Sequence, residues 1–178
     1  MNNQSTVKKL ILFSLLSLAL ISCAVKVNTV YDHRVGFKKY KSFCWLKGCE
    51  FTFKGPRYLK EPLIQQQLQN AIIAGMKKKG ISYNNDRPDL LMDVHVVMET
   101  DTVYAYYLPG DTYLLSFMGN EEIIMLKGTL VIDLVDKSTS QMVWRSTAVS
   151  YFNAHPELTE RNFRNGVAAA LRKFPPKK

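Results

Sequence analysis

The sequence predicts an α+β fold, in which a mainly antiparallel sheet carries two amphipathic helices packed on one face. Residues 128–148 are rich in β-branched and aromatic side chains that alternate with period two, as in two strands with one face on a core. Two other stretches, residues 59–79 and 155–174, repeat apolar side chains at three- and four-residue spacing. Each such helix needs an apolar surface, and the sheet supplies one.

Length and composition indicate one domain. The chain has 178 residues, of which 47% are hydrophobic and 22% are charged, the balance of an ordinary globular domain. A chain of this length can bury a sizeable core without disulfide bonds.

The first 23 residues read as an export signal. Lys8 and Lys9 precede an apolar run over residues 10–21, which has the length of a signal-peptide core and is too short to span a membrane. The run ends in Ser22-Cys23, which resembles the lipobox of bacterial lipoproteins. We therefore expect residues 1–22 to be a lipoprotein signal peptide and residues 23–178 to be a single domain with an N-terminal lipid anchor.

The lipobox resemblance implies that Cys23 is the lipidation site. In such signals the cysteine sulfur receives a diacylglycerol, the chain is cut before the cysteine, and the new amino terminus receives a further fatty-acyl chain, palmitate being typical. Several acyl chains give stable anchoring where one is marginal. Ala24, rather than Asp, follows the cysteine, which resembles lipoproteins sent to the periplasmic face of the outer membrane. The alternatives are an ordinary signal peptide, for which the A-x-A-like site is missing, or an uncleaved anchor.

The net charge of the chain limits the classes of partner that we expect. The net charge of +9 falls to +7 when residues 1–22 are removed with their two lysines. For an exported protein, nucleic acid is not an expected partner. Anionic lipid headgroups, lipopolysaccharide or cell-wall polymer fit this charge, and so does simple solubility beside an anionic membrane.

Cys44 and Cys49 are the other two cysteines. Export permits a disulfide bond between them, across a short loop that contains Gly48, provided that their Cα atoms lie within about 7 Å of each other. Metal binding is not expected, because no His or further Cys stands at ligand spacing around them.

Two strands and an irregular segment should follow the anchor. Residues 24–31 alternate weakly and predict a first strand. Residues 37–45 predict a second, with Tyr40, Phe43 and Trp45 as core anchors rather than a platform for stacking a ligand. Residues 46–58 contain glycine and proline and should be irregular.

The first predicted helix covers residues 59–79. Its apolar stripe consists of Leu59, Leu63, Ile64, Leu68, Ala71, Ile72 and Met76. Pro62 fits only the first turn, and Gly80 suits a left-handed cap. The lysines at 77–79 suit the negative end of the helix dipole, and an anion-binding patch is the alternative explanation.

Residues 89–101 predict a strand whose even-numbered apolar residues face the core. Its other face carries Asp93, His95 and Glu99. A carboxylate beside an imidazole can serve acid–base chemistry or bind a metal. A solvated strand face is the simpler interpretation, and we take it, so that no catalytic and no metal residue is predicted.

Residues 102–120 are rich in tyrosine and apolar side chains but are broken by proline and glycine. The segment is either a hairpin that extends the sheet or an exposed apolar lobe. In the second case the binding surface would consist of Tyr104, Tyr106, Tyr107, Tyr113 and Phe117.

The remaining chain completes the sheet and the second helix. Residues 121–136 and 141–153 are the arms of the hairpin, with Trp144 in the core. The second helix opens near Pro156 and ends before Pro175.

A family resemblance runs along nearly the whole mature chain. The residues that carry it are Tyr31-Asp32, Phe37, Tyr40-Lys41-Ser42-Phe43, Trp45, Gly80, Pro88-Asp89, Gly128-Thr129-Leu130, Ile132-Asp133, Asp136, Val143-Trp144-Arg145 and Phe174-Pro175-Pro176. Together they resemble the bacterial lipoproteins grouped as domain of unknown function 4136. Members often carry a Gly- and Tyr-rich loop before the Gly-Thr-Leu strand, whereas residues 104–120 here hold less glycine and more apolar side chains. The resemblance implies an envelope lipoprotein of α+β type and supplies no catalytic residue.

Three functions compete at this stage. The first, which we favour, is a non-enzymatic module that binds an envelope lipid, a glycan or a protein. The second is an enzyme acting on envelope lipid or cell wall, although the sequence has no G-x-S-x-G or H-E-x-x-H motif. The third is a structural or stress-related envelope factor. No cofactor is expected in any of the three.

Overall fold

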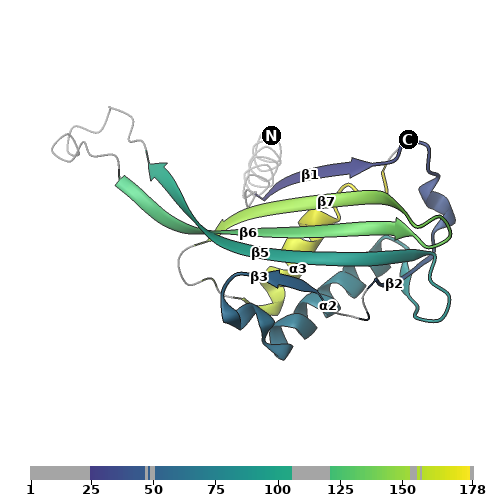
Figure 1. Cartoon of the computed structure of the whole chain (residues 1–178), viewed down its shortest axis with the longest axis horizontal. Helices are drawn as coiled ribbons and strands as arrows, with labels where there is room; N and C mark the ends of the chain where they lie inside the picture. The colour runs from purple at the N-terminus through teal and green to yellow at the C-terminus, as the bar shows by residue number, and fades with distance from the viewer. Residues whose placement is uncertain are drawn as a thin grey trace, which may run out of the picture.

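Figure 1 shows the computed structural model, which describes residues 25–46, 48, 51–105, 121–152, 156 and 158–176. For residues 103–105 and 121–123 it describes the backbone alone. The strands are β1 (Lys26–Tyr31), β2 (Ser42–Trp45), β3 (Thr52–Lys54), β4 (Ser82–Tyr83), β5 (Leu90–Ala105), β6 (Glu121–Asp136) and β7 (Gln141–Phe152). The helices are α2 (Pro62–Lys78) and α3 (Glu160–Ala170), with 3-10 turns η2 (Phe37–Lys39) and η3 (Arg57–Lys60).

Within the described residues, seven strands form one mixed sheet in the order β1-β7-β6-β5-β2-β4, and β3 also pairs with β5. The four strands from β1 to β5 in this order pair antiparallel, so the predicted mainly antiparallel sheet is confirmed. The sequence analysis did not predict the parallel pairs that β2 makes with β4 and β5 and that β3 makes with β5. Helix α2 provides the crossover that the parallel connections to β5 require.

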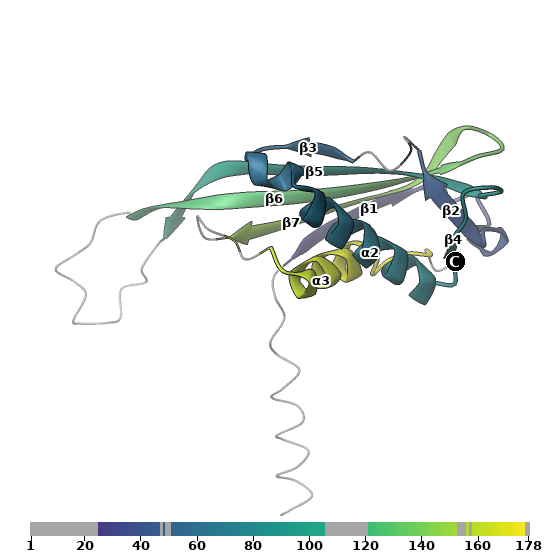
Figure 2. The same ribbon diagram turned by 90° about the horizontal axis from the view of Figure 1, so that it is seen from below.

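Both helices cover the same face of the sheet, as predicted (Figure 2). Neither of them is long and apolar enough to cross a bilayer. Helix α2 buries Leu68, Ala71, Ile72 and Met76. It has Pro62 in its first turn, and Gly80 follows it with a φ of +80° in the left-handed region, both as expected.

The start of α2 was predicted too early. Residues 57–60 form the turn η3, and the helix begins at Pro62 rather than at Leu59. The proline ring holds the preceding Glu61 in extended backbone, with φ −64° and ψ 135°, so a helix cannot run continuously through this point. Leu59 is buried from the 3-10 turn, whereas Leu63 is 61% exposed and lies outside the buried stripe.

The predicted strand over residues 37–45 is divided in two. Phe37–Lys39 form η2, and only Ser42–Trp45 join the sheet. Lys39 and Tyr40 both bond the carboxylate of Asp136, and this requires a turn rather than alternation. Tyr40, Phe43 and Trp45 are buried, as predicted. The segment expected to be irregular contains β3, which pairs with residues 95–97 of β5.

The hairpin of β6 and β7 is confirmed, with one irregularity. The pairing register shifts between Leu134 and Val135, where β7 contains a bulge. The extra residue turns both Val143 and Trp144 inward, with 3% and 0% exposure, and leaves Met142 45% exposed. Strict alternation had placed Met142 on the same face as Trp144.

Helix α3 begins at Glu160, later than predicted. The Oγ1 of Thr159 accepts a hydrogen bond from the Asn162 N–H at 3.3 Å, and this N-cap defines the start. The C-terminal half of α3 is held closely: the Ser146 hydroxyl donates to the Ala170 carbonyl at 2.8 Å. At Gly75 of α2, an added Cβ would lie 3.0 Å from Leu171 and 3.1 Å from Val167. The two helices therefore approach one another most closely where α2 has no side chain.

Strands β5 and β6 continue beyond the rest of the sheet. Their pairing extends to Ala105 and Glu121, whereas β7 ends at Phe152 opposite Leu126. Residues 101–105 and 121–125 thus form a two-stranded arm that projects from the body (Figure 1). Ile124 on this arm is 67% exposed. The strand predicted to end at residue 101 is longer by four residues.

Candidate functional site

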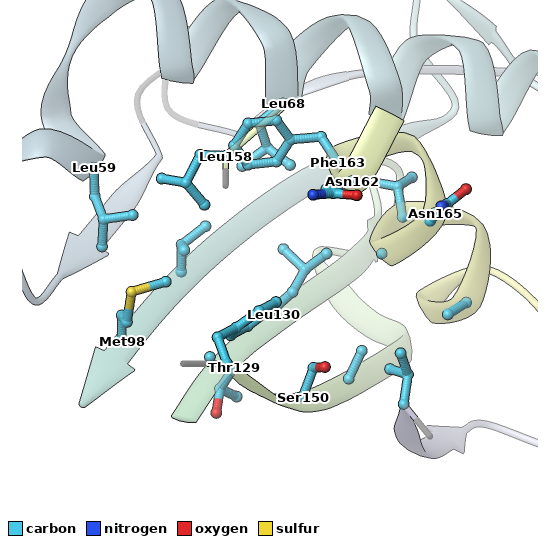
Figure 3. Close-up of a pocket in the computed structure, with 18 residues that line it drawn as sticks. Leu59, Leu68, Met98, Thr129, Leu130, Ser150, Leu158, Asn162, Phe163 and Asn165 are labelled. Atoms are coloured by element: carbon cyan, nitrogen blue, oxygen red, sulfur yellow. The ribbon is translucent and has the colours of Figure 1, made fainter. Parts of the chain in front are cut away.

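A cavity of about 450 Å³ lies between the N-terminal half of α3 and the sheet, next to the base of the arm. Figure 3 shows Leu59, Leu68 and Phe163 on the helical side, and Met98 and Leu130 on the strands across from them. The remaining wall comes from Val25, Val96, Gly128, Thr129, Ala148, Ser150, Phe152, Leu158, Asn162, Asn165, Gly166, Val167 and Ala169. The wall is therefore mostly hydrocarbon. The volume of the cavity is in the range of small-molecule binding sites.

Two glycines shape this cavity. An added Cβ on Gly128 would lie 2.7 Å from the ring of Phe152, so the missing side chain lets that ring lie across β6 as part of the cavity wall. On α3, an added Cβ at Gly166 would meet no atom within 4 Å. Gly166 therefore faces open space, and a larger side chain there would project into the cavity without a clash.

Polar groups stand only at a few points of the wall. Asn162 and Asn165 of α3 are exposed at the rim, and Ser150 lies on β7 across from them (Figure 3). Within the described part of the chain, the lining residues include no carboxylate, imidazole, thiol or amine. These residues can orient a ligand through hydrogen bonds, and none of them titrates near neutral pH.

The predicted His95 cluster lies on the opposite, helix-free face of the sheet. His95 Nε2 is 3.2 Å from Asp93 Oδ2, and Asp93 is the cross-strand partner of Asp133. Arg145 donates two hydrogen bonds of 2.6 Å to Asp133, which raises the pKa of the guanidinium. Asp133 thus has a guanidinium beside it, which offsets the repulsion between two directly opposed aspartates. Among the described residues, no group of three acidic, His or Cys side chains could hold a metal ion.

A second polar cluster, which we call the clasp, lies at the end of the sheet away from the arm and comprises Lys39, Tyr40, Ser42, Asp89 and Asp136. Asp136 accepts hydrogen bonds from Lys39 Nζ and the Tyr40 hydroxyl, each at 2.8 Å, and from the backbone and hydroxyl of Ser138. Lys39 and then Ser138 hold the pKa of Asp136 well below its usual range. Burial, with the bond to Asp136, raises the pKa of Tyr40 to about 12.

Asp89 completes the clasp. Its Oδ2 accepts from the backbone N–H groups of Lys41 at 2.7 Å and Ser42 at 3.0 Å, and also from the Ser42 hydroxyl. These bonds, led by the one from Lys41, lower the pKa of Asp89. The clasp joins the turn before β2 to the ends of β5 and β6. Both carboxylates accept several hydrogen bonds from the protein itself, which gives the clasp a structural role.

Most of the residues singled out from the sequence lie outside the described part of the chain. They are Cys23, Cys49, Tyr106, Tyr107, Tyr113 and Phe117. Tyr104 belongs to β5, where the backbone alone is described. Cys44 is half-buried on β2, with its Sγ 3.5 Å from the Trp45 carbonyl. Lipidation, the disulfide bond and the aromatic binding surface stay predictions.

Sequence reasoning missed the cavity itself. Taken one at a time, the residues of its wall have the character of ordinary core or of an exposed helix face. One feature of the sequence could have indicated the cavity: Gly166 lies within an otherwise helical pattern and is preceded by Asn162 and Asn165. An isolated glycine in a helix is costly relative to alanine and often has a packing or functional reason.

These features define a class of protein: an α+β domain with two helices on one face of a mixed sheet and an apolar cavity under the second helix. The chain belongs to the family described as domain of unknown function DUF4136, whose model matches residues 27–176. No curated protein matches the sequence.

Three solved structures share this fold. A PDZ domain protein from Parabacteroides distasonis has a TM-score of 0.53 and 18% identity over 88% of this chain, which spans 36% of that protein. The PelC dodecamer from Paraburkholderia phytofirmans has a TM-score of 0.52 and 10% identity, covering 86% of this chain and 99% of that one. A DUF4136 family protein from Bacteroides thetaiotaomicron has a TM-score of 0.51 and 17% identity, covering 86% and 95%. At these identities the likeness shows the fold alone.

Proposed function

We propose that this protein is a non-enzymatic envelope lipoprotein that binds the hydrocarbon chain of a lipid in the cavity under α3. The observation that carries the proposal is the apolar cavity of about 450 Å³ with its few polar groups at the rim. Transfer of hydrocarbon from water is worth about 0.8 kcal/mol per CH₂ group, so a free fatty acid taken up from solution would gain enough from several methylenes to bind. The predicted anchor at Cys23 would place the domain at the periplasmic face of the outer membrane, where such chains are abundant.

The chemistry of the wall favours binding over catalysis. Among the described residues that line the cavity, Ser150 and Thr129 carry the only hydroxyl groups, and none of the others could act as a general base for either of them. The charged pairs of the sheet, Asp93–His95 and Asp133–Arg145, lie on the face without helices. An enzyme would have to bring its acid–base groups from outside this wall.

The two substitutions Gly166→Leu and Ala168→Leu form a matched pair for testing the proposal. Both add the same side chain to α3, but Gly166 lines the cavity whereas Ala168 is exposed and does not. Residues 24–178 contain every described element and would be exported from an ordinary signal peptide, without Cys23. We expect a fluorescent fatty acid to bind the parent and the Ala168→Leu variant, and to bind the Gly166→Leu variant at least about tenfold more weakly.

Unfolding in urea would show that both variants are folded. Equal affinity in the two variants would place the fatty acid outside the cavity. A parent protein that fails to bind any fatty acid would overturn the proposed function.

A further inference from the structure

The start of the domain and the cavity lie at the same place. Val25, which directly precedes β1, lines the cavity together with Ser150 and Phe152 of β7. Strand β1 pairs with β7 so that Lys26 lies opposite Val149, near the base of the arm. Cys23 is two residues before Val25, and two residues span at most about 7 Å. An acyl chain attached to Cys23 can therefore start no farther than about 7 Å from Val25.

The predicted lipidation gives Cys23 more acyl chains than membrane anchoring requires. The lipobox resemblance implies three acyl chains at Cys23: two on the diacylglycerol and one on the amino nitrogen. Two chains already give stable membrane attachment. The third can leave the bilayer without releasing the protein, and transfer from one hydrocarbon environment to another loses no hydrophobic free energy.

Covalent attachment favours this chain over any free lipid. A group tethered by a short link has an effective concentration in the millimolar range at a site that it can reach. The cavity wall beside Val25 is hydrocarbon, and Ser150, Asn162 and Asn165 can meet the amide at the start of the chain.

We propose that, in the anchored protein, the acyl chain on the amino nitrogen of Cys23 occupies the cavity under α3, while the diacylglycerol chains stay in the membrane. This inference rests on the proposed function, because it uses the same cavity and the same anchor. It implies that the cavity end of the sheet is held against the membrane. It also implies that an external lipid enters only by displacing the protein's own chain.

The test compares the full-length protein with three and with two acyl chains at Cys23, made in strains with and without the enzyme that acylates the amino nitrogen. Both forms would be extracted in mild detergent and analysed by native mass spectrometry. We expect the two-chain form to retain one phospholipid per protein and the three-chain form to retain none. Gly166→Leu should abolish retention in the two-chain form, whereas Ala168→Leu should leave it unchanged.

The outcomes separate this inference from the proposed function. Equal phospholipid retention by both forms would overturn the inference and leave the proposed function standing. Retention by neither form would overturn the inference, and, if residues 24–178 also failed to bind a fatty acid, the proposed function with it. Absence of acyl mass on Cys23 would likewise overturn the inference.

A photoactivatable fatty acid supplied to the cells gives a second readout that does not depend on any variant. We expect a cross-link between the acyl chain of Cys23 and a peptide that contains Phe163 or Ser150. Cross-links of these peptides to phospholipid only would show that the cavity takes its chain from the bilayer, and would overturn the inference.

Discussion

Helix α3 and the residues that follow it pack closely on one end of the sheet and leave a cavity at the other end. At the clasp end, Phe174, which follows α3, packs against Trp144 and Phe37, with ring centroids 5.1 and 5.9 Å apart. The Asp136 carboxylate there accepts hydrogen bonds from five nearby groups. At the cavity end, the same helix presents Gly166 and Asn162 to an open space of about 450 Å³. The contrast shows that close packing and an open cavity lie at different ends of one element. Because the C-terminal end of α3 is held by close packing at the clasp end, the space under its N-terminal half can stay open.

The largest expected effect comes from replacing one phenylalanine at each end of the sheet. Phe174 is 1% exposed, whereas Phe163 is half-buried and borders the cavity. We expect Phe174→Ala to lower the free energy of unfolding by about 4 kcal/mol, because it leaves a closed void among aromatic rings. Phe163→Ala should cost about 1 kcal/mol, since it only enlarges an existing space. Urea unfolding followed by circular dichroism would measure both, and equal losses would contradict the comparison.

The second test concerns charge at the clasp end. Asp136→Asn weakens the bonds from Lys39, Tyr40 and Ser138 and leaves the buried Tyr40 hydroxyl poorly matched, at a cost of about 2 kcal/mol at pH 7. The folded-state pKa of Asp136 lies below its ordinary value of about 4, so its contribution is present above that pH and is lost as the pH falls through the lower folded-state value. The parent should therefore lose stability below about pH 4, and the variant should lose less.

Urea unfolding at pH 7 and pH 3 would show this difference in slope. Glu99 at the base of the arm provides the control, because its ion pair with Lys127 is solvent-exposed and Glu99→Gln should change stability very little. A variant at Asp136 with the same acid sensitivity as the parent would show that other carboxylates control the acid response.

Local patterns allowed much of the fold to be predicted. The alternation of Leu130, Ile132 and Leu134 and the helical spacing of Val167 and Leu171 depend only on which face of each element is apolar, and the structure confirms both. The bulge at Val143 and the parallel pairing of β3 depend on distant partners, and no local pattern encodes them. The clasp was not predicted for the same reason: Asp136 ends the first arm of the hairpin, yet it also bonds Lys39 and Tyr40, almost a hundred residues away in the chain.

The cavity was beyond prediction for a different physical reason. Periodicity shows that Phe163 and Leu130 face apolar surroundings, but it does not show how far apart two apolar surfaces stand. That distance is fixed elsewhere, where Ser146 bonds Ala170 and where Gly75 lets the helices approach. A closely packed core and an apolar cavity therefore have the same sequence pattern until the positions of the glycines are considered.

The smallest effect gives the sharpest test of the difference between the two ends, and it uses Gly→Ala at two helical sites. At Gly166 a Cβ meets nothing within 4 Å, so Gly166→Ala should stabilise the protein by about 0.5–1 kcal/mol through helix propensity alone. At Gly75 the added Cβ would press on Leu171 and Val167 at 3.0 and 3.1 Å, and this should cancel or reverse the same gain. Thermal and urea unfolding would measure both variants. If Gly166→Ala destabilised the protein, α3 would have to pack on the sheet along its whole length, and the cavity would not exist in solution.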